Sequence, residues 1–181
     1  MTTPYDVVVL LGTDHHRFER LVGWVDDWLG RQAAAPTVLV QHGWSAAPRL
    51  ADGLDLVPYQ ELQRYMAAAR AVVCHGGPAT MLEVRRRGRR PIVVPRDPAL
   101  REHIDDHQQL FCRRMAGLDL ITLCETQPDF ESALDGALRD PGTVTVTVAQ
   151  AASYEREIAA AVVAAGAIVD DLAERHARHV R

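Results

Sequence analysis

The sequence contains no lysine, few cysteines and no long apolar run. Its charge, its cysteines and its apolar segments each bear on which classes of protein it can belong to. All 20 basic residues are arginine, and the formal net charge of −4 does not favour nucleic-acid binding. The three cysteines (Cys74, Cys112 and Cys124) have no paired spacing, so we expect buried free thiols in a reducing compartment. No segment approaches the roughly 20 apolar residues that a membrane-spanning helix needs, and no secretory leader pattern is visible. We therefore expect a soluble, cytoplasmic protein.

Several familiar nucleotide-binding and catalytic signatures are absent as well. The first glycine turn carries only Gly12, without the GxGxxG pattern of dinucleotide-binding folds, and this argues against a dehydrogenase. The GxxxxGK[ST] phosphate loop is missing, and no Ser-His-Asp or Cys-His set has a local signature. His103 and His107 are four residues apart, but no third ligand is evident. We therefore expect no metal site, and the catalytic residues are left unassigned.

The sequence does contain a regular alternation of short apolar runs and helical patterns. Such runs are typical of strands buried on both faces of a parallel sheet. They cover residues 5–11, 37–41, 54–57, 71–74, 91–94 and 118–122. Helical spacing follows at residues 18–29, 61–69, 78–88, 106–115 and 130–138. This alternation predicts an α/β fold, with one Rossmann-like parallel sheet of about six strands flanked by helices.

The stretch from Cys74 to Glu83 (CHGGPATMLE) is the strongest functional signal. Gly76 and Gly77 permit a tight turn and a close approach to a ligand, and Pro78 suits the first turn of a helix. The free N–H groups and the positive dipole end of that helix favour an anion, typically a phosphate. Glu83, one turn further on, is placed to bind ribose hydroxyls. An ordinary strand-to-helix turn is the alternative interpretation.

Other turns are predicted to meet this one at a single edge of the sheet. The ligand site of such a fold lies beyond the carboxyl ends of the strands. The turns expected there are Gly12–Thr13, His42–Gly43, Pro58–Tyr59, His75–Gly77 and Pro95–Arg96. His15 and His16, which follow the first turn, are interpreted as surface or ligand-edge groups rather than metal ligands. The paired amides of Gln108 and Gln109, at a helix start, suit sugar hydroxyls.

The C-terminal segment has a different pattern. We divide the chain into a binding domain, residues 1–142, and a C-terminal extension, residues 143–181. Residues 143–148 read as a strand or an extended linker, and residues 151–179 as one long helix with a single apolar stripe. This helix either packs across its own domain or presents the stripe to a partner, a second copy of the chain included. The arginine run at 85–90 is either a solvated face or a contact for anionic lipid or an acidic partner.

These residues together resemble a known family. The segments CHGGPATMLEVRRRGRRPIVVPRD and DDHQQLF are similar to the nucleotide-sugar half, the C-terminal domain, of GT-B glycosyltransferases. Similar proteins include the donor half of the enzyme that adds N-acetylglucosamine to lipid I. The small donor-binding subunits of split UDP-N-acetylglucosamine and exopolysaccharide transferases also look alike, and the opening VVVLLGTDHHRFERLV resembles their start. The likeness covers roughly residues 5 to 140.

The resemblance implies a UDP-sugar donor and a role for each matching residue. Glu83 would bind the ribose of UDP, and Gln108 and Gln109, next to His107, would bind the sugar. The segment ending in Pro58 and Tyr59 would frame the uracil through backbone groups. The diphosphate would lie among the residues of the glycine turns, which are Gly12, Thr13, His75, Gly76, Gly77, Ala79 and Thr80, with Arg96 at the same edge. Such enzymes generally need no cofactor or metal, because backbone N–H groups and a helix dipole hold the leaving diphosphate.

The resemblance also implies a missing half. The acceptor-binding domain, which usually supplies the membrane contact and the catalytic base, has no counterpart in this sequence. We therefore predict the donor-binding subunit of a split, inverting glycosyltransferase that acts on a lipid-linked or polysaccharide acceptor. A membrane-anchored partner would recruit it to the inner face of the membrane. A non-catalytic nucleotide-sugar-binding regulatory module is the alternative. A third possibility, an epimerase or hydrolase, would need its own acid and base in the cleft.

Overall fold

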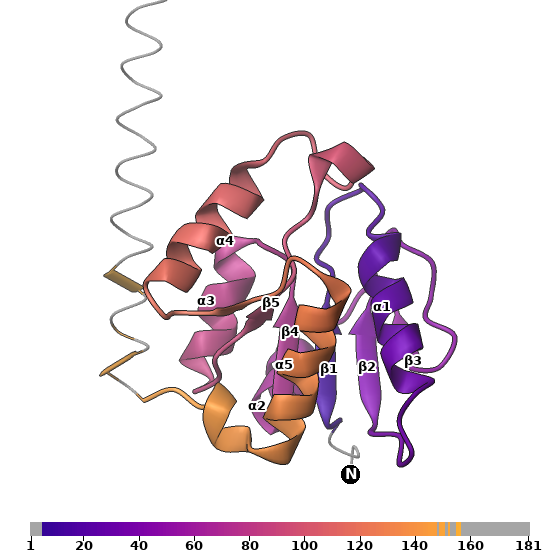
Figure 1. The fold of residues 1–181 in the computed structure, drawn as a ribbon, viewed down its shortest axis with the longest axis horizontal. Helices are drawn as coiled ribbons and strands as arrows, with labels where there is room; N and C mark the ends of the chain where they lie inside the picture. Colours follow the sequence, from indigo (N-terminus) through magenta and orange to yellow (C-terminus); the bar gives the residue numbers. More distant parts are fainter. Residues whose placement is uncertain (1–4, 148, 151, 153–154, 157–181) are drawn as a thin grey trace, which may run out of the picture.

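A parallel sheet organises the residues that the structure describes. The computed structural model describes residues 5–147, 149–150, 152 and 155–156, and Figure 1 shows the sheet with helices on both sides. Its strands are β1 (Val7–Leu10), β2 (Val38–Gln41), β3 (Asp52–Leu54), β4 (Ala71–Cys74), β5 (Ile92–Val93) and β6 (Thr122–Leu123). Neighbouring strands all pair in parallel, in the order β3-β2-β1-β4-β5-β6. The predicted Rossmann-like α/β fold with a six-stranded parallel sheet is confirmed.

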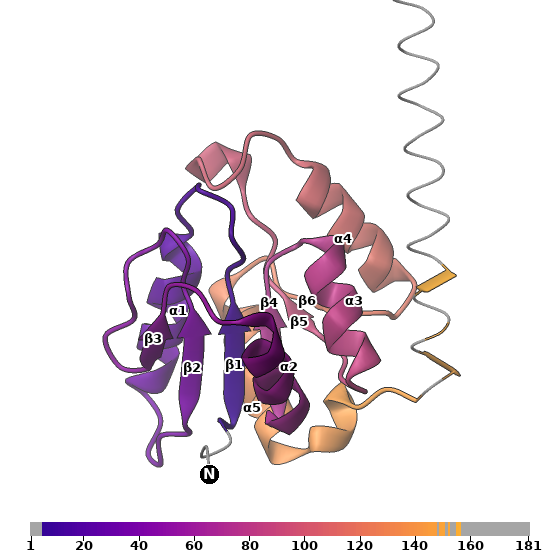
Figure 2. The same ribbon diagram turned by 180° about the vertical axis from the view of Figure 1, so that it is seen from behind.

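In the part of the chain that the structure describes, five named helices cover the two faces of the sheet. They are α1 (Glu19–Leu29), α2 (Tyr59–Ala68), α3 (Pro78–Arg86), α4 (His107–Gly117) and α5 (Gln127–Arg139), with the short turns η1 (Pro98–Leu100) and η2 (Pro141–Val144). Helices α1 and α5 pack on one face, and α2, α3 and α4 on the other (Figures 1 and 2). Each strand of the sheet centre therefore contributes alternate side chains to two cores, which explains its continuous apolar sequence. Val9 packs in the α1–α5 core and Val8 in the opposite one.

The order of the strands places a crevice at the carboxyl edge of the sheet. From β1 the chain proceeds outward through β2 to β3, and then returns across the sheet to β4 on the other side of β1. The loops after β1 and β4 therefore leave in opposite directions. In open α/β sheets this reversal point is where ligands bind.

Two predicted strands lie elsewhere than expected. The third, expected at residues 54–57, is β3 and ends at Leu54; it is an edge strand whose three residues are exposed, so no buried apolar run marks it. The sixth, expected at residues 118–122, starts only at Thr122. Helix α4 ends just before it, with Asp119 in the left-handed region (φ +57°) and the Leu120 N–H bonded to the Met115 carbonyl. Positive φ is incompatible with a continuing strand.

The arginine run, for which we left a solvated face and a partner or lipid contact open, is partly built into the fold. Arg85 is 1% exposed and donates to the backbone carbonyls of Leu120 and Gln150. Arg86 pairs with Glu83 and with Glu155. These side chains join α3 to neighbouring segments, including the start of the C-terminal extension. Arg85 and Arg86 therefore stabilise internal packing, although the Arg86 side chain stays half exposed.

Residues 143–147 continue the packed unit beyond α5. Val144 and Val146 are buried, and Thr145 forms an antiparallel bridge with Arg89. The extended conformation predicted there applies to the part after η2. The long helix expected over residues 151–179 falls almost wholly outside the described residues.

Two expectations from the composition concerned buried free thiols and membrane-spanning helices. Cys74, Cys112 and Cys124 are free and buried, as predicted. Burial raises the pKa of the Cys112 and Cys124 thiols to about 12, so neither is a reactive thiolate at neutral pH. No helix in the described part of the chain combines the length and hydropathy needed to cross a bilayer.

Candidate functional site

A cavity of about 480 Å³ opens at the carboxyl edge of the sheet, next to the reversal point between β1 and β4. Its walls come from the ends of β1 and β2, the loop before α2, the turn between β4 and α3, and the first turn of α4. The lining residues are Leu10, Gly12, Thr13, Asp14, Gln41, Leu56, Val57, Leu62, His75, Thr80 and Gln108.

The cavity brings together part of the predicted set. Gly12, Thr13, His75, Thr80 and Gln108 line it. The other predicted residues do not form its wall, and these are Pro58, Tyr59, Gly76, Gly77, Ala79, Glu83, Arg96, His107 and Gln109. Sequence reasoning did not assign the wall residues Leu10, Asp14, Gln41, Leu56 and Leu62. Gln41 and Asp14 follow or end apolar strands, so the rule used for the turns would have found both.

The first glycine turn is fixed by a side-chain amide. Gln41, the last residue of β2, accepts from the Gly12 N–H through Oε1 (3.1 Å) and donates through Nε2 to the Gly12 carbonyl (3.0 Å). Gly12 has a φ of +83°, which favours glycine, and a Cβ there would lie 2.7 Å from Nε2 of His75. The turn therefore requires glycine both for its backbone and for the imidazole packed against it.

His75 occupies the space between the two glycine turns. A Cβ added to Gly77 would overlap its ring, as would one on Gly12. Its Nε2 lies 3.4 Å from the Thr80 hydroxyl, and its Nδ1 is buried without a hydrogen-bond partner among the described residues. Burial, helped by the charge of Arg96, lowers the His75 pKa to about 4. At neutral pH the cavity thus contains an uncharged imidazole with one unsatisfied nitrogen.

The N-terminus of α3 faces the same region. Pro78 starts the helix, and the N-cap residue is Gly77, which has no side chain that could cap it. The N–H groups of the first turn, at Ala79 and Thr80, therefore have no intrahelical partner, and the helix dipole adds partial positive charge. This is the arrangement by which helix starts bind phosphate.

Glu83 lies one turn beyond Thr80, where donors from α2 hold its carboxylate. Tyr59 Oη and Gln63 Nε2 donate to Oε2 at 3.2 and 3.3 Å, and Arg86 donates to Oε1 at 3.2 Å. The carboxylate is thus oriented between α2 and α3. Tyr59 contacts Glu83 through its hydroxyl. The backbone role toward the uracil that the resemblance implied stays a prediction.

Only one member of the predicted His-Gln-Gln group reaches the cavity. Gln108 lines it and accepts from the Arg96 N–H at 3.4 Å. His107 is exposed and pairs with Asp105 (2.9 Å), and this hydrogen bond raises the His107 pKa. Successive side chains of a helix project in different directions around its axis, so Gln109 does not share the direction of Gln108.

The buried Arg96 side chain forms hydrogen bonds with the loops after β1 and β5. Its guanidinium donates to the carbonyls of Leu11 (2.8 Å), His16 (2.6 Å) and Glu102 (3.0 Å), and it lies over the Phe18 ring at 4.9 Å. It is 1% exposed, so it positions the loop after β1 against the loop after β5. We expected a ligand contact at this residue; the structure gives it a supporting place behind the cavity wall.

Asp14 connects the cavity to a histidine pair. It lines the cavity, and its Oδ1 accepts from the backbone N–H of His16 (2.7 Å) and from the His16 ring (2.6 Å). Partial burial raises the pKa of Asp14, but these hydrogen bonds and the charge of Arg96 outweigh it, and the pKa is lowered overall. The carboxylate is therefore ionised at neutral pH.

Comparison with known proteins identifies the family to which the chain is similar. The sequence profile described as the glycosyltransferase family 28 C-terminal domain matches residues 7–162. Similar solved structures include Acinetobacter baumannii MurG (TM-score 0.56, 17% identity) and the glycotransferase of kitacinnamycin (0.60, 16%). CalG4, the calicheamicin glycosyltransferase, is similar too (0.58, 16%). No curated protein sequence matches significantly.

The fold is that of a GT-B C-terminal, nucleotide-sugar half. The likeness covers 86–87% of this chain but only 46%, 40% and 39% of the three solved chains, so the chain spans less than half of each. The family match extends over most of the sequence. The chain belongs to the glycosyltransferase family 28 C-terminal domain family.

Proposed function

We propose that this chain binds the UDP-sugar donor of a glycosyltransferase and stabilises the UDP that departs. One observation carries the proposal beyond family membership: a single cavity joins the first glycine turn, the start of α3 and Gln108. The diphosphate then lies at the N-terminus of α3, beside the hydroxyls of Thr13 and Thr80. Leu56 and Val57 offer apolar surface to the uracil.

The remaining contacts follow from this placement. The Glu83 carboxylate, already oriented by Tyr59 and Gln63, takes the ribose hydroxyls in place of one of these donors. The sugar extends toward Gln108 and Asp14. Both are good partners for hydroxyl groups, because an amide donates and accepts while a carboxylate accepts two bonds.

The chemical step is a direct displacement at the anomeric carbon with inversion. Negative charge develops on the leaving diphosphate, and the N–H groups and dipole at the start of α3 stabilise that charge without a metal on the phosphates. A base deprotonates the acceptor hydroxyl. We assign that base to an acceptor-binding half, so the present chain supplies donor binding and leaving-group stabilisation.

A separate, membrane-anchored subunit is the acceptor-binding half in this proposal, and it presents a lipid-linked or polysaccharide acceptor at the inner face of the membrane. Large exposed apolar side chains, Trp44 and Leu56 among them, stand near the cavity and would be covered by such a partner. Dimerisation through the C-terminal helix, which lies outside the described residues, stays a prediction.

Calorimetric titration tests donor binding. The purified chain is titrated with UDP, UDP-N-acetylglucosamine, UDP-glucose and, as a negative control, NAD. Glu83→Ala should weaken uridine nucleotide binding by about tenfold to a hundredfold, because a hydrogen bond to a charged group contributes about 1.5–3 kcal/mol. Glu61→Ala, which removes an exposed carboxylate of α2 paired with Arg64, should leave the affinity unchanged.

Two results would contradict the proposal. The first is the absence of uridine nucleotide binding both in the isolated chain and after co-expression with an acceptor-binding subunit. The second is wild-type affinity in Glu83→Ala. If a UDP-sugar binds but the assembled enzyme transfers no sugar, the chain is instead a non-catalytic nucleotide-sugar-binding module.

A further inference from the structure

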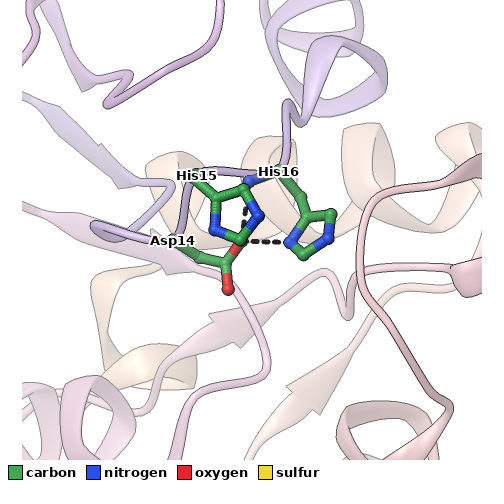
Figure 3. A group of neighbouring side chains, drawn as sticks. All are labelled: Asp14, His15 and His16. Carbon is green, nitrogen blue, oxygen red and sulfur yellow. Dashed lines mark hydrogen bonds and ion pairs between the residues drawn. The ribbon is translucent and has the colours of Figure 1, made fainter.

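A group of three potential metal ligands lies directly beside the donor cavity. One ligand atom each from Asp14, His15 and His16 lies within 4.8 Å of the others, and Figure 3 shows the carboxylate facing the His16 ring with the His15 ring beside it. The two imidazoles are 4.1 Å apart between centroids. The three residues belong to the loop between β1 and α1, outside the diphosphate contacts proposed above.

The surrounding structure holds this loop in place. The His16 carbonyl accepts from the buried Arg96 guanidinium at 2.6 Å, and the His16 N–H donates to Asp14 at 2.7 Å. Because both backbone groups of His16 are bonded, the loop conformation that gathers the three side chains is fixed before any ion binds. A preformed site loses less conformational entropy on binding than one assembled by the ion.

Coordinating atoms are available on all three side chains. His15 is exposed and makes no hydrogen bond among the described residues, and only Oδ1 of Asp14 is engaged. The His16 Nδ1 lies 2.6 Å from Oδ1 of Asp14, with a proton between them. Ligand atoms around one tetrahedral ion are about 3.3 Å apart, so a small opening of this pair, with the ring proton moved to Nε2, admits an ion.

We propose that Asp14, His15 and His16 form a binding site for a divalent transition-metal ion of the Zn²⁺ type. Two imidazoles and one carboxylate favour Zn²⁺, Co²⁺ or Ni²⁺ over Mg²⁺ and Ca²⁺, which prefer oxygen ligands alone. Three protein ligands leave a fourth position open for water or another small ligand. Since Asp14 also lines the donor cavity, a bound ion would fix one wall of that cavity.

The test is a titration of the tag-free, chelator-treated full chain with Zn²⁺, in the absence of nucleotide. We expect saturable binding of one ion, and no binding of Mg²⁺ under the same conditions. His15→Ala and His16→Ala should each weaken Zn²⁺ binding by about tenfold or more, since even outer-shell partners of metal ligands contribute this much. Co²⁺ loading should give the visible absorption of a site with nitrogen ligands in the wild type only.

The chain offers a matched control and a variant that keeps the fold. His107 forms the same kind of pair with Asp105, at 2.9 Å, and His103 lies 3.3 Å from the same carboxylate. The ligand atoms of these three described residues do not, however, all lie within 4.8 Å of one another, as those of Asp14, His15 and His16 do. His107→Ala should therefore bind Zn²⁺ as the wild type does. Because His15 is exposed, His15→Ala is expected to remain folded, and circular dichroism checks this.

The proposal is overturned if the wild type shows no saturable Zn²⁺ binding, or if either His15→Ala or His16→Ala keeps wild-type affinity. The titration contains no nucleotide, so its failure leaves the proposed donor binding untouched. Conversely, a chain that binds Zn²⁺ but no uridine nucleotide, either alone or after co-expression with an acceptor-binding subunit, would contradict the donor proposal alone.

Discussion

Replacing His75 by glutamine should make the stability of the protein less sensitive to acid. In the folded chain burial lowers the His75 pKa to about 4, whereas an exposed histidine in the unfolded chain has a pKa of about 6.5. The unfolded state therefore binds more protons between these two values. The stability that depends on neutral His75 is complete above about pH 6.5 and is lost as the pH falls toward about 4.

The size of the effect follows from the same two pKa values. At pH 5 the unfolded imidazole is almost fully protonated and the folded one almost fully neutral, which costs the native state about 2 kcal/mol relative to pH 7.5. For a chain of this length that loss lowers the melting temperature by about 4–8 °C. Glutamine does not titrate, so the variant lacks this part of the acid sensitivity.

Urea unfolding of wild type and His75→Gln at pH 7.5 and pH 5.0 measures this difference. Carboxylates with lowered pKa values, such as Asp6, destabilise both proteins equally in acid, so the double difference isolates His75. His107→Gln is the control: its exposed ring has a raised pKa, so removing it should not reduce the acid sensitivity. Equal losses of stability in wild type and His75→Gln between the two pH values would refute a buried, neutral His75.

Two further substitutions test the support of the cavity. Gly12→Ala should destabilise the protein by about 1–3 kcal/mol in urea unfolding, because of its φ of +83° and a Cβ 2.7 Å from the His75 ring. Gly23→Ala, within α1 and with nothing within 4 Å of the added carbon, should instead be neutral or stabilising, and equal effects would contradict the argument. Arg96→Met should cost about 3 kcal/mol or more, because two buried carbonyls and one partly buried carbonyl lose their donor. A Met variant as stable as the wild type would show that these bonds contribute little.

The sequence predicted the architecture well because buried parallel strands have a distinctive pattern. The runs that became β1 and β4 are apolar throughout, and both were placed within a few residues of their observed bounds. The edge strand β3 carries no such run, because its side chains are exposed. Hydrophobic pattern reports burial, so it locates the sheet centre better than the sheet edge.

The position of the candidate site was predictable from the sequence, but the hydrogen-bond partners of its residues were not. The glycine turns and Thr80 could be placed because parallel strands share a carboxyl edge. The roles of Gln41 and Arg96 depend on contacts between residues distant in sequence, such as the 2.8 Å bond from Arg96 to the Leu11 carbonyl. No local pattern encodes a pairing over 85 positions. The same holds for Tyr59, whose hydroxyl reaches Glu83 from another helix.

The contacts between the segment that follows α3 and the residues after α5 have a practical consequence for the production of this domain alone. The Arg90 N–H donates to the Val144 carbonyl (2.6 Å) and the Val146 N–H to the Gly88 carbonyl (3.0 Å). A protein cut after residue 142 would lose both bonds, two buried valines and the Gln150 carbonyl that receives Arg85. The cut would remove one of the carbonyl acceptors of the buried Arg85 guanidinium, and this destabilises the folded domain. Shortened versions should therefore stop beyond residue 150, although the sheet itself is complete far earlier.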